Sequence, residues 1–311
     1  MMRALACLLL LAGLCLLPRA AHAQACSYTF NGPMNFGTIT GVPTPTIDVS
    51  ATVNVNCGAL FIGTIRTCIS FPNSDESAGA RLMTLPTGET VRFQLYKDAA
   101  RTQPLGAYGE ASGPLTVDVP VFIFGNETAT VYGRVFPNQD DKPVGDYARQ
   151  LTIQGRERAG TATPCESIGG TPQSVPASSA ILSIDPMCTV SADPLNFGSF
   201  SNLSVNRDAS TNLRLKCTLK APYQISLNGG STTGTVSNRR MSQAGNPASI
   251  GYQLYSDSNR SQIWGNTAAN WVLGTGTGAS QAYTIYGRVP PQAMPSIVGA
   301  FEDTVTVTVS Y

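Results

Sequence analysis

Histidine is almost missing from this chain of 311 residues, which has a single one, His22. His22 lies in a segment with the form of an export signal, so the exported chain is expected to contain none. This excludes a Ser-His-Asp triad, a Cys-His pair and a histidine-ligated metal site. We therefore expect no catalytic residues, no metal, no cofactor and no enzymatic activity.

Long apolar runs are also scarce, and the one that is present belongs to the signal. Arg3 precedes the leucine-rich run 5–17, and the small-x-small site 21–23 stands before Gln24. The run is too short for a stop-transfer helix, and no later stretch approaches the ~20 apolar residues that cross a bilayer. Residues 1–23 are predicted to be a signal peptide, and the remaining 288 residues are enough for two domains.

Charge of either sign is low, since only 13% of the residues are Asp, Glu, Lys or Arg. Removal of the signal takes two of the 20 basic residues and leaves 18 against 19 acidic ones, a net charge of −1. A nearly neutral chain has no electrostatic basis for binding nucleic acid or an anionic membrane. We expect no nucleic acid among its partners.

The cysteines form no CxxC pair, which argues against thioredoxin chemistry and a zinc ribbon. Two of the eight leave with the signal, and an even number in an exported chain indicates disulfides. The six that remain are Cys26, Cys57, Cys68, Cys165, Cys188 and Cys217.

One sequence pattern occurs twice in the chain. Five blocks follow one another in the same order in both halves: a cysteine, an NFG motif, a QLY motif with a later Asp, a YGR motif, and a Val-Gly-x-aromatic segment before an alternating run. The pairs are 26–30 with 188–192, 34–37 with 195–198, 91–98 with 250–257, 131–137 with 285–291, and 144–154 with 298–311. This repetition predicts two related domains, 24–177 and 188–311.

The blocks are short, alternate with a period of two and are rich in Val, Ile, Thr, Tyr and Phe. There is no helical stripe of useful length, so the sequence predicts an all-β sandwich in each half. Strands are expected near 27–39, 47–57, 65–71, 91–96, 129–136 and 147–154, and near 189–200, 209–217, 223–228, 250–255, 283–289 and 303–311. Disulfides Cys26–Cys57 and Cys188–Cys217 would then join the first two strands of each domain.

Taken together, these motifs resemble those of the spore coat protein U domain family, the pilin-like modules of archaic chaperone–usher pili. The resemblance covers both halves and implies two tandem immunoglobulin-like, pilin-type sandwiches, the second without its final strand. It also implies a two-domain tip adhesin whose open domain receives a donor strand from the next pilin subunit. A periplasmic chaperone and an outer-membrane usher are the assembly partners that it implies.

The segment between the halves, 178–187, contains an alternating apolar run of the length of one strand. We predict that this linker strand completes the first domain, with Ala180, Leu182 and Ile184 in the core. The alternative is that it forms the first strand of the second domain.

The two ends of the exported chain are expected to differ in what they supply. The sixth strand of the second domain ends at Tyr311, so a partner strand is expected to cover Val305, Val307, Val309 and Tyr311. Only Gln24 and Ala25 precede the first cysteine, so this subunit is expected to accept a strand and give none. That combination predicts export through the periplasm and a place at the cell surface, on the tip of a pilus.

Three longer connections of the first domain, 58–64, 99–128 and 155–177, are predicted to lie at one pole of the sandwich, clamped by Cys68–Cys165. Apolar side chains there are expected to bind an abiotic or host surface and promote biofilm formation. They are Leu60, Phe61, Ile62, Leu105, Tyr108, Val121, Phe122 and Phe124. The alternative is that 60–62 and 122–124 fill the core of the domain itself, with 119–124 as a buried strand.

Two other functions fit the same sequence. Polar residues of these connections would make the protein a glycan-binding, lectin-type pilus adhesin. Without a specific ligand, it would be a structural spore-coat or matrix protein.

Overall fold

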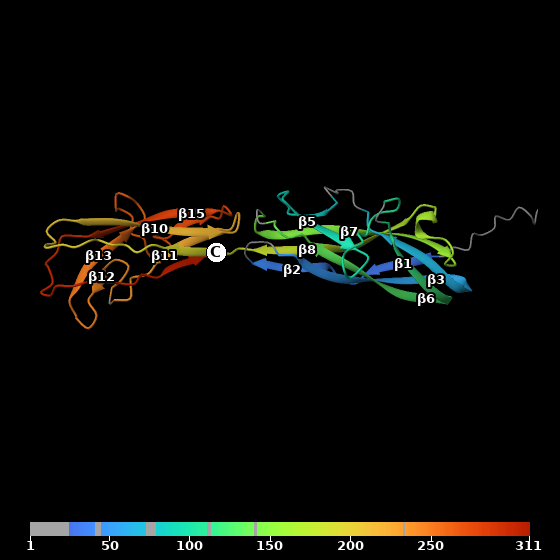
Figure 1. The fold of residues 1–311 in the computed structure, drawn as a ribbon, viewed down its shortest axis with the longest axis horizontal. Coiled ribbons are helices and arrows are strands. Elements are labelled where there is room, and N and C mark those ends of the chain that lie inside the picture. The colour runs from blue at the N-terminus through green and yellow to red at the C-terminus, as the bar shows by residue number, and fades with distance from the viewer. Residues whose placement is uncertain (1–24, 41–44, 73–78, 111–112, 140–141, 233) are drawn as a thin grey trace, which may run out of the picture.

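The computed structural model describes residues 25–40, 45–72, 79–110, 113–139, 142–232 and 234–311, and shows two all-β domains arranged in line (Figure 1). The predicted signal peptide, 1–23, lies outside the described residues. In the described part of the chain, no helix is long and apolar enough to cross a membrane.

The first domain is an immunoglobulin-like sandwich made from one strongly curled sheet. Its strands are β1 (Ala25–Phe30), β2 (Met34–Thr40), β3 (Ile47–Ser70), β4 (Arg81–Thr84), β5 (Thr90–Tyr96), β6 (Leu115–Val135), β7 (Gly145–Ala159) and β8 (Gln173–Asp185). The strand order is β1-β3-β6-β5-β4-β7-β8-β2, and an additional pairing of β3 with β7 closes the curl. A 3-10 turn, Cys165–Ser167, precedes β8.

Two long strands, β3 and β6, form an antiparallel ribbon that belongs to both layers of this sandwich. Their register runs from Ile47 opposite Val135 to Ile69 opposite Leu115. The first half of β3 also pairs with β1 and the second half with β7. The ribbon therefore crosses from one layer to the other at one end of the domain.

All three connections predicted for the first domain were wrong in part. Residues 155–159 of the third connection belong to β7, and residues 173–177 belong to β8. The sequence predicted separate strands 47–57 and 65–71 joined by a loop for the first connection, and a loop over all of 99–128 for the second. Instead β3 is continuous, and 115–128 belongs to β6 because Val117, Val119 and Val121 alternate into the core. For 119–121 the alternative, a buried strand, is the one that the structure has.

The linker strand β8 lies between two strands of the first domain. It runs antiparallel to β7 and parallel to β2. Ala180, Leu182 and Ile184 are buried in the core of that domain. Both neighbours of β8 belong to the first domain, so this segment supplies its last strand.

The second domain repeats the fold, and its described residues form no equivalent of β8. Its strands are β9 (Cys188–Ala192), β10 (Arg207–Cys217), β11 (Pro222–Leu227), β12 (Arg239–Ser242), β13 (Ser249–Tyr255), β14 (Val272–Thr275), β15 (Ser280–Val289) and β16 (Val307–Ser310). They form a five-stranded sheet, β12-β13-β15-β10-β9, and a three-stranded sheet, β14-β11-β16.

Two predicted strands of this domain are shorter than expected. Of 189–200 only β9 is a strand, and of 303–311 only β16 is. The counterpart of 195–200 in the first domain is β2, which pairs with β8. Among the described residues no strand pairs with 195–200, so its backbone has no ladder to join.

Three disulfides join the cysteines in the pairs that the sequence analysis named, Cys26–Cys57, Cys68–Cys165 and Cys188–Cys217. The first and third connect equivalent strands, β1 to β3 and β9 to β10. In the chain-entropy model, closing loops of this length stabilises each domain by roughly 3–4 kcal/mol.

The YGR motif serves the fold of each domain. Arg134 Nε lies 2.7 Å from Asp48 Oδ1, and Arg288 Nε lies 2.7 Å from Asp208 Oδ1. These hydrogen bonds lower the pKa of both aspartates. In each domain the motif therefore ties two neighbouring strands together by an ion pair.

Candidate functional site

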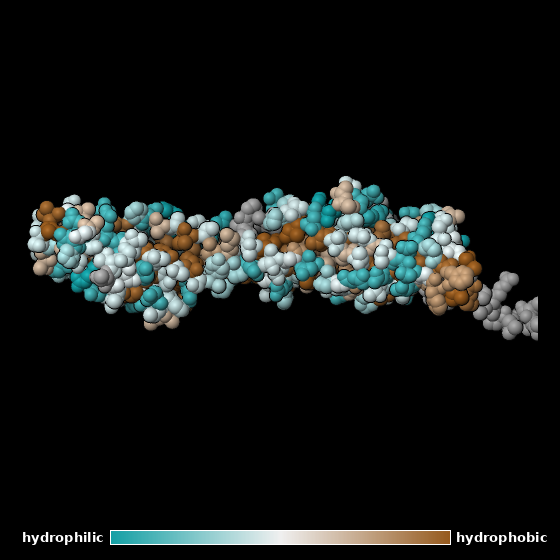
Figure 2. Space-filling view, turned by 90° about the horizontal axis from the view of Figure 1, so that it is seen from below, coloured by the Kyte–Doolittle hydropathy of each residue, from teal (hydrophilic) through white to brown (hydrophobic). Residues whose placement is uncertain are grey.

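Exposed apolar side chains gather where the β3–β6 ribbon bends, at the end of the first domain farthest from the second. Figure 2 shows them as a brown cluster at that end of the molecule. Their exposed fractions lie between 51% and 82%. We call this group the distal pole, and its members are Leu60, Ile62, Phe122, Ile123 and Phe124.

Local backbone features explain why the ribbon bends there. The register shifts by a bulge between Gly58 and Ile62, which turns the strand and re-aims its side chains. Ile123 has a φ of +73°, a conformation that β-branched residues rarely adopt. A Cβ on Gly125 would lie 1.9 Å from the carbonyl oxygen of Pro120, so only glycine fits. The bend is therefore built into the sequence, and it pushes apolar residues outward.

The structure brings together four of the eight residues predicted for surface binding: Leu60, Ile62, Phe122 and Phe124. The side chain of Phe61 lies outside the described residues. Ile123 was missed, although it stands within the same apolar run, 121–124.

Three predictions for surface-binding residues need correction. Leu105 and Val121 are buried, and Tyr108 is half-buried. The backbone N–H of Leu105 donates to the carbonyl of Leu95, which holds its side chain inside the domain. Val121 lies on the inward face of β6. These three side chains support the first domain and are not part of the distal pole.

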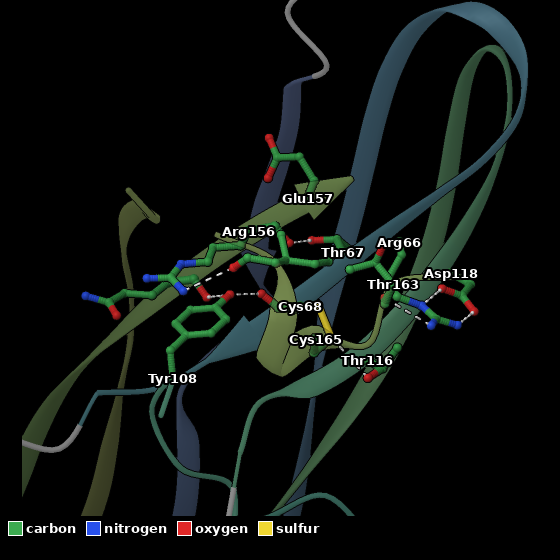
Figure 3. Close-up of a disulfide and its surroundings, with 12 residues drawn as sticks. Arg66, Thr67, Cys68, Tyr108, Thr116, Asp118, Arg156, Glu157, Thr163 and Cys165 are labelled. Carbon is green, nitrogen blue, oxygen red and sulfur yellow. Dashed lines mark hydrogen bonds and ion pairs between the residues drawn. A yellow bond between two sulfur atoms is a disulfide. The ribbon is translucent and has the colours of Figure 1, made fainter. Parts of the chain in front are cut away.

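The Cys68–Cys165 disulfide and its surroundings brace the second half of the ribbon (Figure 3). The Tyr108 hydroxyl donates to the carbonyl oxygen of Cys68, and the guanidinium carbon of Arg156 lies 4.2 Å from the centre of the Tyr108 ring. Tyr108 is thus a packing residue between the disulfide and β7. This contact explains why it is not free to bind a surface.

An ion pair and a hydrogen bond to a carboxylate join strands in the same region. Arg66 Nη2 on β3 lies 2.7 Å from Asp118 Oδ2 on β6, which ties the two halves of the ribbon. The Tyr28 hydroxyl on β1 donates to Glu157 Oε2 on β7 over 3.2 Å. Burial raises the pKa of the Glu157 carboxyl. Polar contacts as well as packing therefore hold β3 to β6, which carry the distal pole, and hold β1 to β7.

The second candidate site is a strip of half-buried apolar side chains in the second domain, at the position that β8 fills in the first. One side of the strip is the segment with Leu195, Phe197 and Phe200, and the other is the run with Val305, Val307 and Val309. All six side chains are half-buried against the core. We call this the acceptor groove. It contains three of the four residues predicted for the assembly strand, and Tyr311 is exposed beyond them.

The residues that line the acceptor groove match those that line the position of β8 in the first domain. A Cβ on Gly133 would meet the side chains of Met34 and Phe36 at 2.4 and 2.9 Å. A Cβ on Gly287 would meet Leu195 and Phe197 at 2.6 and 2.8 Å. Met34 and Phe36 are buried under β8, whereas Leu195 and Phe197 are half-buried. The two domains thus have the same groove, filled in one and open in the other.

Backbone groups along the acceptor groove are open to a partner. β16 pairs with β11, and among the described residues no strand pairs with its other edge. An open strand edge beside an apolar groove is a template for an added β-strand. Chemically, this site can bind an extended peptide with alternating apolar side chains.

Comparison with known proteins gives two sequence matches. The chain matches the family model of the Spore Coat Protein U domain over residues 13–154 and 173–308. Protein U of Myxococcus xanthus is 33% identical over 129 residues, which are 38% of this chain and 71% of that protein.

Two solved structures are similar over most of the chain. One is the CsuC-CsuE chaperone–tip adhesion subunit pre-assembly complex of the archaic chaperone-usher Csu pili of Acinetobacter baumannii, with 18% identity, coverage of 92% of this chain and 100% of that chain, and a TM-score of 0.49. The other is the CupB6 tip adhesin of Pseudomonas aeruginosa, with 11% identity, coverage of 93% and 94%, and a TM-score of 0.43.

Proposed function

The chain belongs to the spore coat protein U domain family, and on that premise we propose that it is the tip adhesin of an archaic chaperone–usher pilus. In this proposal the protein is exported through the periplasm and displayed at the cell surface. It attaches cells to abiotic or host surfaces through the distal pole and so promotes biofilm formation. It has no catalytic role.

The observation that carries the proposal is the difference between the two grooves. β8 fills the groove of the first domain from within the same chain, so that domain needs no partner strand. The acceptor groove of the second domain is the place for one donor strand from the next pilin subunit. Because the subunit binds its neighbour through the second domain, the distal pole is left at the free end of the fibre.

Assembly requires that the acceptor groove be covered before the donor strand arrives. An exposed apolar strand edge pairs readily with other chains and leads to aggregation. We assign this protection to a periplasmic chaperone and the exchange for the donor strand to an outer-membrane usher.

Adhesion through the distal pole is weak for one molecule and strong for many. Removing ~200 Å² of apolar surface from water contributes about 5 kcal/mol. Association costs roughly 4–15 kcal/mol of translational and rotational freedom, so a single pole holds poorly. Many fibres on one cell raise the avidity by orders of magnitude.

The proposal is tested by replacing Leu60, Ile62 and Phe124 with serine in cells that make the pilus. Attachment to polystyrene should fall by at least about tenfold, because avidity multiplies the loss at each contact. Fibre number, counted by electron microscopy, should not change. Leu273→Ser is the matched control, since Leu273 is 72% exposed on β14 of the second domain.

Attachment that stays the same in the triple variant would remove the distal pole from the proposal. Binding of the purified protein to a glycan array, unaffected by the three serines, would favour the lectin-type function instead. Fibres that carry the protein along their length would favour a structural coat or matrix role.

A further inference from the structure

The two domains meet through a loop of the second domain and two segments of the first. The backbone N–H of Val144 donates to the carbonyl oxygen of Leu219 over 3.0 Å. Lys220 forms an ion pair with Glu89, which stands directly before β5. The same loop is tied to the end of the linker, because Thr218 N donates to Met187 O over 2.9 Å.

The first domain contributes Val144 and its neighbours to this junction. The second domain has the equivalent residues at its other end, the end that points away from the first domain. Val298 stands where Val144 stands, each directly before a glycine with the same unusual backbone, φ +139° at Gly145 and +142° at Gly299. Val144 is half-buried beside the second domain, whereas Val298 is 93% exposed. The equivalent valines are thus half-buried in the first domain and exposed in the second.

Two further exposed apolar side chains lie on the loops at this end of the second domain. Val205 and Met294 are both exposed, and a hydrogen bond from Gln292 N to Leu203 O, 2.9 Å long, joins the two loops that carry them. Figure 2 shows brown atoms at this end of the molecule, opposite the distal pole. We call Val205, Met294 and Val298 the proximal pole.

The direction of the missing strand leads toward the proximal pole. In the first domain β8 runs parallel to β2, with Ala180 beside Met34 and Ile184 beside Ile39. The counterparts of Met34 and Ile39 are Leu195 and Phe200. A donor strand in the same register therefore has its last apolar residue beside Phe200 and leaves the groove at the proximal pole.

We infer that the proximal pole is a docking surface for the globular body of the next pilin subunit, which repeats the junction between the two domains of this chain. This inference rests on the proposed function, because the same neighbour supplies the donor strand. The junction within this chain defines the sequence pattern that the docked pilin should have. Two residues separate β8 from Cys188, and the docked loop directly follows Cys217, the disulfide partner of Cys188.

The chemistry of the repeated junction is more apolar than that of the original. The residue before β5 is Glu89, and its counterpart before β13 is Ala248. The ion pair with Lys220 has no equivalent at Ala248. The neighbour's loop is therefore expected to dock through backbone and apolar contacts, without a required lysine.

The inference is tested by placing the photo-crosslinking amino acid p-benzoylphenylalanine at Val298 in cells that assemble the pilus. Irradiated, isolated fibres should yield the adhesin joined to one pilin. Mass spectrometry should place the crosslink in the neighbour directly after the second cysteine of its disulfide. Because Val298 is so exposed, the substitution leaves the fold intact.

Two further positions make the outcomes distinguishable. The same amino acid at Phe200 reports the donor strand, and at Lys216, exposed on β10, it is the negative control. Two results would overturn the docking surface and leave the proposed function standing. One is a crosslink at Phe200 without a crosslink at Val298. The other is a crosslink from Val298 to the donor strand only. Loss of both crosslinks overturns both.

Discussion

Glu157 on β7 is joined by hydrogen bonds to β1, the first strand of the first domain. It accepts hydrogen bonds from the Tyr28 hydroxyl and, at 3.5 Å, from the backbone N–H of Cys26. The Tyr28 hydroxyl also lies 2.7 Å from Thr67 Oγ1. Burial raises the pKa of Glu157 against the lowering effect of these hydrogen bonds. The folded domain therefore holds the proton of this carboxyl more tightly than the unfolded chain does.

A raised pKa in the folded state fixes the sign of a pH effect. The contribution of Glu157 to stability is fully present below the ordinary pKa of glutamate and is lost as the pH rises through the folded value. Glu157→Gln keeps an acceptor oxygen but does not ionise. We expect the variant to gain stability relative to the parent between pH 3.5 and pH 7.

Denaturant unfolding of both proteins at the two pH values measures this difference, and all other groups cancel in the comparison. A gap between variant and parent that is the same at both pH values would show that Glu157 carries no raised pKa.

Some side chains are unpredictable from sequence because their partners are remote along the chain. The guanidinium of Arg81 is buried and donates to the carbonyls of Phe71 and Leu105, at 2.6 and 2.9 Å. Arg239 does the same in the second domain, with the carbonyl of Trp264 at 2.7 Å. Nothing in the local sequence marks these arginines as core residues. The prediction for Leu105 was wrong for this reason, because its place depends on Arg81.

At the scale of elements, the strand that closes the first domain was predictable, but the lack of a strand at 195–200 in the second domain was not. The alternation of Ala180, Leu182 and Ile184 is visible in the sequence, and the structure places all three in the core. Segment 195–200 has the same motif as β2, yet it is not a strand. A strand needs a hydrogen-bonding partner, and sequence similarity between the two copies does not supply one.

The glycines of the β3–β6 ribbon led to the prediction of a loop in place of a continuous strand. Gly58 and Gly63 bracket the apolar residues, which is the usual signature of a loop. Here they serve a bulge inside a continuous strand, and the pairing with β6 persists on both sides. The apolar character of the distal pole was therefore predictable, but the ribbon that presents it was not.

The linker strand gives a direct test at this scale. Leu182→Ala removes a buried side chain and should destabilise the first domain by about 2–5 kcal/mol. The second domain should not respond. Both tryptophans, Trp264 and Trp271, lie in the second domain, so their fluorescence follows that domain while circular dichroism follows both.

Denaturation of Leu182→Ala should therefore move the first domain's part of the circular-dichroism transition to lower denaturant and leave the tryptophan transition in place. Leu273→Ala, at an exposed position, is the control and should change stability by about 0.5 kcal/mol or less. An unaltered dichroism curve for Leu182→Ala would show that β8 does not stabilise the first domain.

At the scale of the whole molecule, the two domains stand in line (Figure 1). The distal pole is at one end and the proximal pole at the other, with the acceptor groove along the second domain. Membership in the spore coat protein U domain family accounts for the repeated fold. The filled groove of the first domain and the open one of the second follow from β8, which pairs with strands of the first domain on both sides.

The central claim is that this subunit stands at the free end of a pilus. Gold-labelled antibody against the first domain, applied to isolated fibres and viewed by electron microscopy, tests it most directly. We predict label at one end of each fibre and none along the shaft. Label spaced along the length of the fibres, or its absence from them, would contradict the account.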